Sequence, residues 1–428
     1  MAIKPSHILG MNARHLYTSM NPSSAKQYGF SKLKTKELMN EHGIPTPQVY
    51  HIFSNHSETD EVNWDALPVP FVIKPANGLA GKGIWIIKDK HPTEQIWRNN
   101  FNEELDLADI KLHVQNIIDG EFSVWGSNHQ AIIEERIMAH PALAKYSFKG
   151  TPDVRVIVFN SVPVMAEARI PTKESEGKAN LDRGAIGLGI DMATGISTYG
   201  ITGKSGFISH FPNSKKKVNG IKIPNWTQLL ETAVLAANAA GFVFMGADLF
   251  VHPEKGPMIV ELNGFPGLSI QLANRAGLKR RLERVEGLEV RDHKHGVKIA
   301  QALFAESFAD KIKAEDGLQI IPIHPDITIY ADDQNPQNLN AQVNTSRYRS
   351  AISQQLAEEL GLVDYEDLLW QQQEATEGKV PVVEVSYKLK NRRYKTAMVV
   401  TKKLNRSTYK VELGRNDIQG LLIGESDE

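Results

Sequence analysis

Three oxygen-bearing side chains near a predicted turn could together hold a metal ion. Asp248 lies in an apolar run at 244–251, and Glu261 and Asn263 lie at the end of a second run that begins at residue 258. The residues between the runs are turn formers, which predicts a β-hairpin. Carboxylate and amide oxygens suit a hard cation such as Mg²⁺ or Mn²⁺. The alternative is a hairpin with two solvent-facing acids.

A second feature could bind phosphate. Lys74 ends the apolar run 70–75, and a glycine-rich turn at 76–83 leads to another strand at 84–88. A lysine inside an apolar strand is costly unless it meets an anion, and backbone N–H groups of a glycine-rich turn can bind phosphate. Neither a Walker loop nor a dinucleotide-binding fingerprint is present, because a strand follows the turn instead of a helix. The turn alone would be weak support; with Lys74 it favours nucleotide binding.

Charged residues alternate along a third predicted hairpin, at 153–170. Asp153 and Arg155 point to one face of its first strand, and Glu167 and Arg169 to one face of its second. Such residues could form a solvated face or cross-strand ion pairs of about 0.2–1 kcal/mol each. Taken singly, they favour that structural interpretation.

The helices and strands predicted around these candidate site residues are mostly short. Ser31 caps a predicted helix at 31–42, whose lysines Lys32, Lys34 and Lys36 are most simply its solvated face. The charged region 93–109 is predicted to be helical. Further helices are predicted at 226–240 and 293–308, and a charged linker at 311–317 precedes short β-rich runs.

The composition is that of an ordinary globular protein. The 428 residues carry a formal net charge of −1 and contain no cysteine, so nucleic-acid binding is not expected and neither disulfides nor thiolate sites exist. Basic residues outnumber acidic ones ten to two between Glu384 and Arg415, which favours a solvated face. Residues 232–251 are as long as a membrane span, but Gly241 divides them, which predicts a helix, a break and a buried strand. No signal-peptide pattern is present, and a cytoplasmic location is expected.

Taken in order, these motifs resemble the ATP-grasp superfamily over residues 8–300, and within it the α-L-glutamate ligase-like branch. The resemblance implies an α/β (α+β) fold with ATP held between two lobes. A carboxylate would be activated to an acyl phosphate, which an amine then attacks. Ser31 stands where relatives have Asp, and the N-terminal lobe is shorter than in ordinary glutamate ligases, which leaves the acceptor open.

The resemblance also implies roles for individual residues. Lys32 and Lys74 would hold phosphates, and the turn would cover them. Glu134, Glu135 and Ile137 would form the hinge that contacts the base or ribose. Arginines would stabilise charge during the reaction. The implied sets are: catalytic, Arg155, Arg169 and Arg183; nucleotide-binding, Lys32, Lys74, Gly78, Gly81, Lys82, Gly83, Glu134, Glu135, Ile137, Asp153, Lys178 and Asn180; metal-binding, Asp248, Glu261 and Asn263.

The C-terminal region resembles the retropepsin-like domains known as ATP-dependent zinc proteases. The matching stretches are 340–346, which contains Ala-Gln-Val-Asn-Thr-Ser, and 411–420. Asn344 stands where relatives have the catalytic aspartate, and an aspartic protease needs two carboxylates that share a proton. The resemblance therefore implies a non-proteolytic binding module, and a homodimer through this domain is expected from single-lobe relatives.

We therefore expect an N-terminal segment at 1–65, an ATP-grasp domain at 66–310 with lobes at 66–139 and 140–310, and a β domain at 318–428. The expected function is an ATP- and Mg²⁺-dependent carboxylate–amine ligase that transfers glutamate or a related amino acid to a peptide or small molecule. The alternatives are an ATP-grasp phosphoryl transferase or sugar-transfer-associated enzyme, and a nucleotide-binding scaffold with a pseudo-protease module.

Overall fold

The computed structural model describes residues 4–77, 82–122, 129–203, 206–305, 319–331, 336–366, 368–390, 392–419 and 421–424. Mixed helices and strands confirm the predicted α+β class. The chain forms two compact units: unit 1 comprises Met1–Ile190 and Gly195–Glu286, and unit 2 comprises Asp191–Thr194 and Gly287–Glu428. Within the described ranges, no helix is both long and apolar enough to cross a membrane.

Unit 1 begins with a group of short helices. Ser31 caps α3 as predicted, since its side chain accepts a hydrogen bond from the backbone N of Lys34 at 3.3 Å. Gly43 ends the helical segment in the left-handed conformation, with φ of 64°. These helices are η1 (Pro5–His7), α1 (Met11–Thr18), α2 (Ser23–Phe30) and α3 (Lys32–Glu41).

The first sheet of unit 1 has six strands in the order β1-β6-β2-β3-β4-β5. Its core contains Phe71, Trp97 and Ile110. The region 93–109, predicted to be helical, instead forms two strands and the start of a helix, so that prediction is wrong. The elements are β1 (Val49–Phe53), α4 (Glu58–Glu61), η2 (Trp64–Ala66), β2 (Phe71–Pro75), β3 (Trp85–Lys90), β4 (Ile96–Asn99), β5 (Glu104–Asp106), α5 (Leu107–Ile118) and β6 (Ala131–Glu135).

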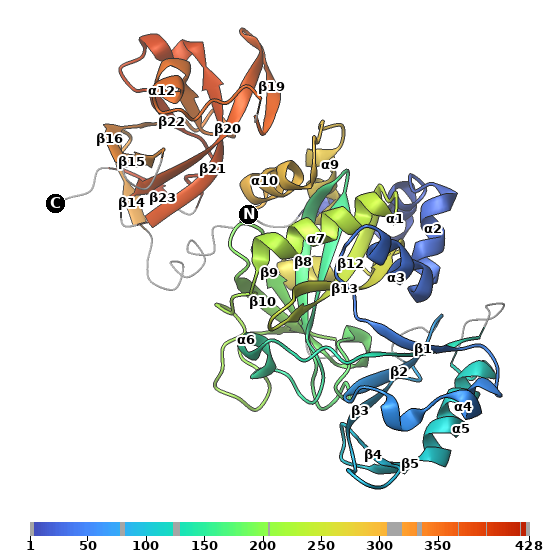
Figure 1. Cartoon of the computed structure of the whole chain (residues 1–428). Helices are drawn as coiled ribbons and strands as arrows, with labels where there is room; N and C mark the ends of the chain where they lie inside the picture. Colours follow the sequence, from blue (N-terminus) through green and yellow to red (C-terminus); the bar gives the residue numbers. More distant parts are fainter. Residues whose placement is uncertain are drawn as a thin grey trace. The chain divides into compact units, whose positions relative to one another are not determined.

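The second sheet has seven strands in the order β11-β10-β9-β8-β7-β12-β13. Both predicted hairpins are present: Asn160 and Ser161, each with positive φ, join β7 to β8, and β12 pairs with β13. Figure 1 shows α7 lying across this sheet. The elements are α6 (Pro141–Ala144), β7 (Asp153–Phe159), β8 (Val162–Ile170), η3 (Leu181–Arg183), β9 (Ile186–Ile190), β10 (Ser197–Thr202), β11 (Gly206–Ile208), α7 (Trp226–Ala239), β12 (Phe244–His252), β13 (Gly256–Asn263), α8 (Ile270–Asn274) and α9 (Leu278–Val285).

Unit 2 is mostly β-structure. Its main sheet has the order β16-β15-β20-β21-β18-β22-β17, with β19 paired to β20. The first described helix of unit 2, α10, follows Glu286, where unit 1 ends. The elements are α10 (His293–Leu303), β14 (Gln319–Ile321), β15 (Asp326–Tyr330), β16 (Pro336–Asn340), β17 (Gln342–Val343), β18 (Ala351–Ser353), α12 (Gln354–Glu359), β19 (Trp370–Glu374), β20 (Gly378–Leu389), β21 (Arg392–Thr401), η4 (Lys402–Arg406), β22 (Val411–Leu413) and β23 (Leu421–Ile423).

Candidate active site

A buried ionic cluster in unit 1 joins α3 to the first sheet. Glu134 on β6 lies between two lysines: its Oε1 is 2.5 Å from Nζ of Lys74 on β2, and its Oε2 is 3.0 Å from Nζ of Lys36 on α3. All three residues are at most 5% exposed. The interpretation of Lys36 as part of a solvated helix face is therefore wrong.

Lys36 also holds the chain between α3 and β1. Its ammonium group donates to the carbonyl of Pro47 at 2.9 Å and to the hydroxyl of Thr46 at 3.3 Å. Burial lowers the pKa of Lys36 to about 8, although the negative charge of Glu134 opposes the shift. Sequence patterning gave no sign of this role, since a helical lysine is ordinarily solvated.

Lys32 connects this cluster to the second sheet. Burial lowers its pKa, and the charges of Glu261, Lys74 and Glu134 all act on it. The edge of β13 is tied to the same segment, because the N–H of Ile259 donates to the carbonyl of Pro45 at 2.8 Å. Lys32 is thus within electrostatic reach of both Lys74 and Glu261.

Other predicted nucleotide-binding residues are spread more widely. Glu135 is ion-paired with Lys255 at 2.6 Å, and the carbonyl of Ile137 accepts a hydrogen bond from Thr151 at 2.7 Å. Lys82 is exposed and Gly83 half-buried, with φ of 68°. Gly78 and Gly81 lie outside the described residues.

Two further predicted residues lie in the loop that joins β8 to β9. Lys178 is 3.6 Å from Glu176, and Asn180 accepts from the N–H of Asp182 at 2.9 Å. Arg183 ends η3 and is half-buried. None of these contacts joins the loop directly to the cluster around Glu134.

A second ionic cluster lies on one face of the second sheet. Arg155 donates to both carboxylate oxygens of Asp248, at 2.7 Å each. Arg169 donates to Asp153 through Nε at 2.7 Å and Nη2 at 2.5 Å, and Nη2 also lies 2.6 Å from Asp248. Of the two structural interpretations, the solvated face is wrong, since Asp153, Arg169 and Asp248 are buried. The cross-strand ion pair is confirmed, because Asp153 and Arg169 are register partners on β7 and β8.

Glu167 belongs to this face and was not among the predicted site residues. It is 1% exposed, and its Oε1 has no hydrogen-bond partner in the described part of the chain. Burial raises its pKa to about 7, against the opposing effect of Arg169 and Arg155. Its alternation with Arg169 was visible in the sequence, but alternation alone does not reveal burial on both faces of a sheet.

The predicted metal ligands are neighbours in the structure. Asp248 and Glu261 are register partners on β12 and β13, and Asn263 lies opposite Gly246. Burial would raise the pKa of Asp248, but Arg155 and Arg169 outweigh it and lower the pKa to about 2, so this carboxylate is charged at neutral pH. Among the described residues, no group of three His, Cys, Asp or Glu side chains is arranged for a metal. The donors fit a cation held by two carboxylates and one amide oxygen.

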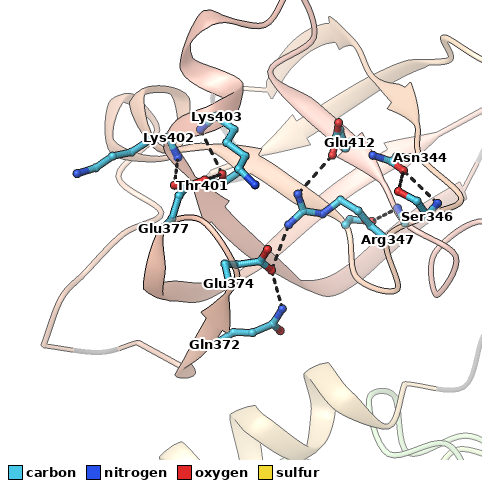
Figure 2. A network of polar contacts seen from close by, with 12 residues as sticks. Asn344, Ser346, Arg347, Gln372, Glu374, Glu377, Thr401, Lys402, Lys403 and Glu412 are labelled. Carbon is cyan, nitrogen blue, oxygen red and sulfur yellow. Dashed lines mark hydrogen bonds and ion pairs between the residues drawn. The ribbon is translucent and has the colours of Figure 1, made fainter.

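Unit 2 brings together the two stretches singled out in its sequence. Strand β17 pairs with β22, and the N–H of Asn344 donates to the carbonyl of Leu413 at 2.9 Å. The side-chain oxygen of Asn344 accepts from the N–H and hydroxyl of Ser346, at 3.1 and 2.6 Å. Figure 2 shows Arg347 beside this turn, between Glu374 at 3.4 Å and Glu412 at 3.6 Å.

A model of one known protein family matches most of unit 1. The model of the family described as sugar-transfer associated ATP-grasp matches residues 11–287. A search of curated proteins finds no match.

Solved structures that match part of this chain include three ligases. A D-Ala:D-Ser ligase from Enterococcus faecalis is 16% identical, with a TM-score of 0.37 over 62% of this chain and 63% of that one. The ATP-grasp ligase PsnB complexed with a minimal precursor is 13% identical, with a TM-score of 0.35 over 61% of each chain. An L-amino acid ligase from Bacillus licheniformis is 12% identical, with a TM-score of 0.35 over 61% of this chain and 49% of that one. The match thus spans less than two thirds of each of these three proteins.

Proposed function

Because the chain belongs to the sugar-transfer associated ATP-grasp family, we propose that it is an ATP- and Mg²⁺-dependent ligase that joins a carboxylate to an amine. The donor we favour is glutamate or a related amino acid, as in the glutamate ligase-like proteins that the sequence resembles. The acceptor is a peptide or a small-molecule amine. We place the reaction in the cytoplasm, where ATP is available.

The observation that carries this proposal is the excess of buried positive charge around Glu134. Lys36 and Lys74, two cations, both pair with this single carboxylate. A buried charge without a counter-ion is strongly unfavourable. The triphosphate of ATP would supply the missing negative charge, with Lys32 and Lys74 as its ligands.

The remaining residues divide by role. Glu134, Glu135, Ile137 and Asp153 contact the nucleoside, and Lys178 and Asn180 border the site. Mg-ATP, when bound, supplies the phosphoryl group that activates the substrate carboxylate, with Asp248, Glu261 and Asn263 as the metal ligands. Cations fixed in advance stabilise charge that develops in a transition state, and we assign that role to Arg155, Arg169 and Arg183.

Mass spectrometry of the reaction products tests this function. The protein is incubated with Mg-ATP, glutamate and a panel of amines and peptides, beside a Glu261→Gln variant. A matched control, Glu254→Gln, changes an exposed glutamate in the β12–β13 turn. We expect a mass gain that corresponds to an amide, lost in Glu261→Gln and kept in Glu254→Gln. ATP consumption at full rate without any amine would contradict ligation.

The family description, sugar-transfer associated ATP-grasp, supports keeping one alternative, an ATP-grasp phosphoryl transferase or sugar-transfer-associated enzyme. The same experiment separates the two functions when sugars are added to the panel. A phosphate-sized mass gain on a sugar would support transfer, whereas an amide would support ligation.

For unit 2 we propose a non-proteolytic, retropepsin-like binding module that also dimerises. Asn344 supports the loss of proteolysis, since an amide cannot act as a general base. If no turnover is found but calorimetry detects Mg-ATP binding, a nucleotide-binding scaffold with this module becomes the better interpretation. Light scattering of the whole chain tests dimerisation.

A further inference from the structure

One cross-strand row of charged side chains crosses four strands of the second sheet. Glu261 on β13, Asp248 on β12, Arg155 on β7 and Glu167 on β8 are successive register partners. Directly opposed residues of antiparallel strands point to the same face. Arg155 therefore lies between two carboxylates, Asp248 on one side and Glu167 on the other.

Of these two carboxylates, Arg155 donates hydrogen bonds to Asp248. Both of its hydrogen bonds to a carboxylate in this row, at 2.7 Å each, go to Asp248. Glu167 is more deeply buried than Asp248, at 1% against 5% exposure, yet its Oε1 has no hydrogen-bond partner among the described residues. A buried polar atom without a partner is uncommon and calls for an explanation.

The space around Glu167 is shaped to hold its carboxyl group. A Cβ atom placed on Gly187 of β9 would lie 2.4 Å from Oε1 of Glu167, and 3.0 and 3.1 Å from side-chain carbons of Leu181 and Ile201. Glycine at position 187 therefore leaves room for the carboxyl beside an apolar cluster. Burial there raises the pKa of Glu167 to about 7.

The hydrogen bonds of Asp248 conflict with its proposed role as a metal ligand. Both of its oxygens hold guanidinium groups, whereas a cation needs at least one of them. Arg169 would keep two hydrogen bonds to Asp153 if it lost Asp248. Arg155 would lose its counter-ion, and an unpaired buried charge is strongly unfavourable.

We propose that Glu167 is a positioning residue for the metal site: when a divalent cation binds Asp248, the guanidinium of Arg155 moves from Asp248 to Glu167. The inference rests on the proposed function, because it requires a cation at Asp248. Glu167 receives the arginine that the cation displaces, and Asp248 is then free to bind through its oxygens. This exchange explains why Glu167, on the side of Arg155 away from Asp248, keeps a buried carboxyl oxygen without a hydrogen-bond partner among the described residues.

The test is a double-mutant cycle read out by Mn²⁺ binding, measured by electron paramagnetic resonance on the whole chain without nucleotide. The variants are Glu167→Gln, Arg155→Met and the two together, with Glu254→Gln as the exposed control. We expect Glu167→Gln to weaken Mn²⁺ binding about tenfold, as for coupled neighbours in direct contact. In the Arg155→Met background, where no arginine needs a new partner, Glu167→Gln has no effect.

Any other result for these variants would overturn the proposal. Unchanged Mn²⁺ affinity in Glu167→Gln, or an equal loss in the Arg155→Met background, overturns the exchange of partners. Failure of the wild-type protein to bind Mn²⁺, or undiminished binding by Asp248→Asn, removes the proposed metal site and this inference with it. Circular dichroism confirms folding; if Glu167→Gln does not fold, Glu167→Asp, which keeps a shorter carboxylate, takes its place with an expected smaller loss of affinity.

Discussion

Lys74 and Glu134 form a buried ion pair between neighbouring strands β2 and β6, with Nζ of Lys74 2.5 Å from Oε1 of Glu134. Glu134 has a second partner, Lys36, on its other oxygen. Lys74 can therefore turn toward a phosphate without leaving Glu134 unpaired. This arrangement lets a buried lysine change partners at little cost.

Replacing Lys74 is expected to impair nucleotide binding more than folding. A hydrogen bond to a charged group contributes about 1.5–3 kcal/mol, so Lys74→Met should weaken binding of a non-hydrolysable ATP analogue by at least about tenfold. Isothermal titration calorimetry measures the affinity. Lys88→Met, on the exposed face of β3, is the matched control, and equal affinities for the two variants would exclude Lys74 from the nucleotide site.

Lys36 is expected to act mainly on stability. Lys36→Met removes one partner of Glu134 and the donor to the carbonyl of Pro47, which should lower the free energy of unfolding by about 3 kcal/mol. Urea denaturation followed by tryptophan fluorescence measures the change. Lys34→Met on the exposed side of the same helix should change it by no more than about 0.5 kcal/mol. Similar values for the two variants would refute the buried role of Lys36.

Glu167 predicts a specific pH dependence of stability. Its pKa rises from 4.5 to about 7 on folding, so the folded state binds more protons between these values. The resulting stabilisation is complete below pH 4.5 and is lost as the pH rises through 7. Between pH 4.5 and 8 the wild type should therefore lose about 3 kcal/mol relative to Glu167→Gln. Urea denaturation across this range measures the difference, and parallel pH profiles for the two proteins would contradict it.

Restoring the missing carboxylate in unit 2 should not restore proteolysis. Asn344→Asp places one acid in a turn where Asn344 now accepts two hydrogen bonds from Ser346. An aspartic protease needs two carboxylates that share a proton. The proposed dimer would supply one from each chain, but the hydrogen bonds from Ser346 hold each new carboxylate within its own turn. We expect no cleavage of an unstructured protein or of a peptide library, as judged by mass spectrometry. Cleavage by the variant would overturn the binding-module interpretation.

The sequence by itself determined the local elements that carry the candidate site. The β12–β13 hairpin follows from two apolar runs around turn residues, and the β7–β8 hairpin from alternation around Asn160 and Ser161. Ser31 capped its helix as predicted. Such features depend on residues that are close together in the chain, so the pattern of the sequence is enough to predict them.

Tertiary structure decided which charged residues are buried and with whom they pair. Lys36 and Glu167 have the spacing of solvated residues on a helix and on a strand, yet both are buried. Lys36 lies against Glu134 and Pro47, and Glu167 lies beside Gly187 of the neighbouring strand. The charged region 93–109 was predicted to be helical, yet part of it forms strands that pair into a sheet. Burial and partner choice depend on contacts between residues far apart in the chain, and local periodicity carries no information about those contacts.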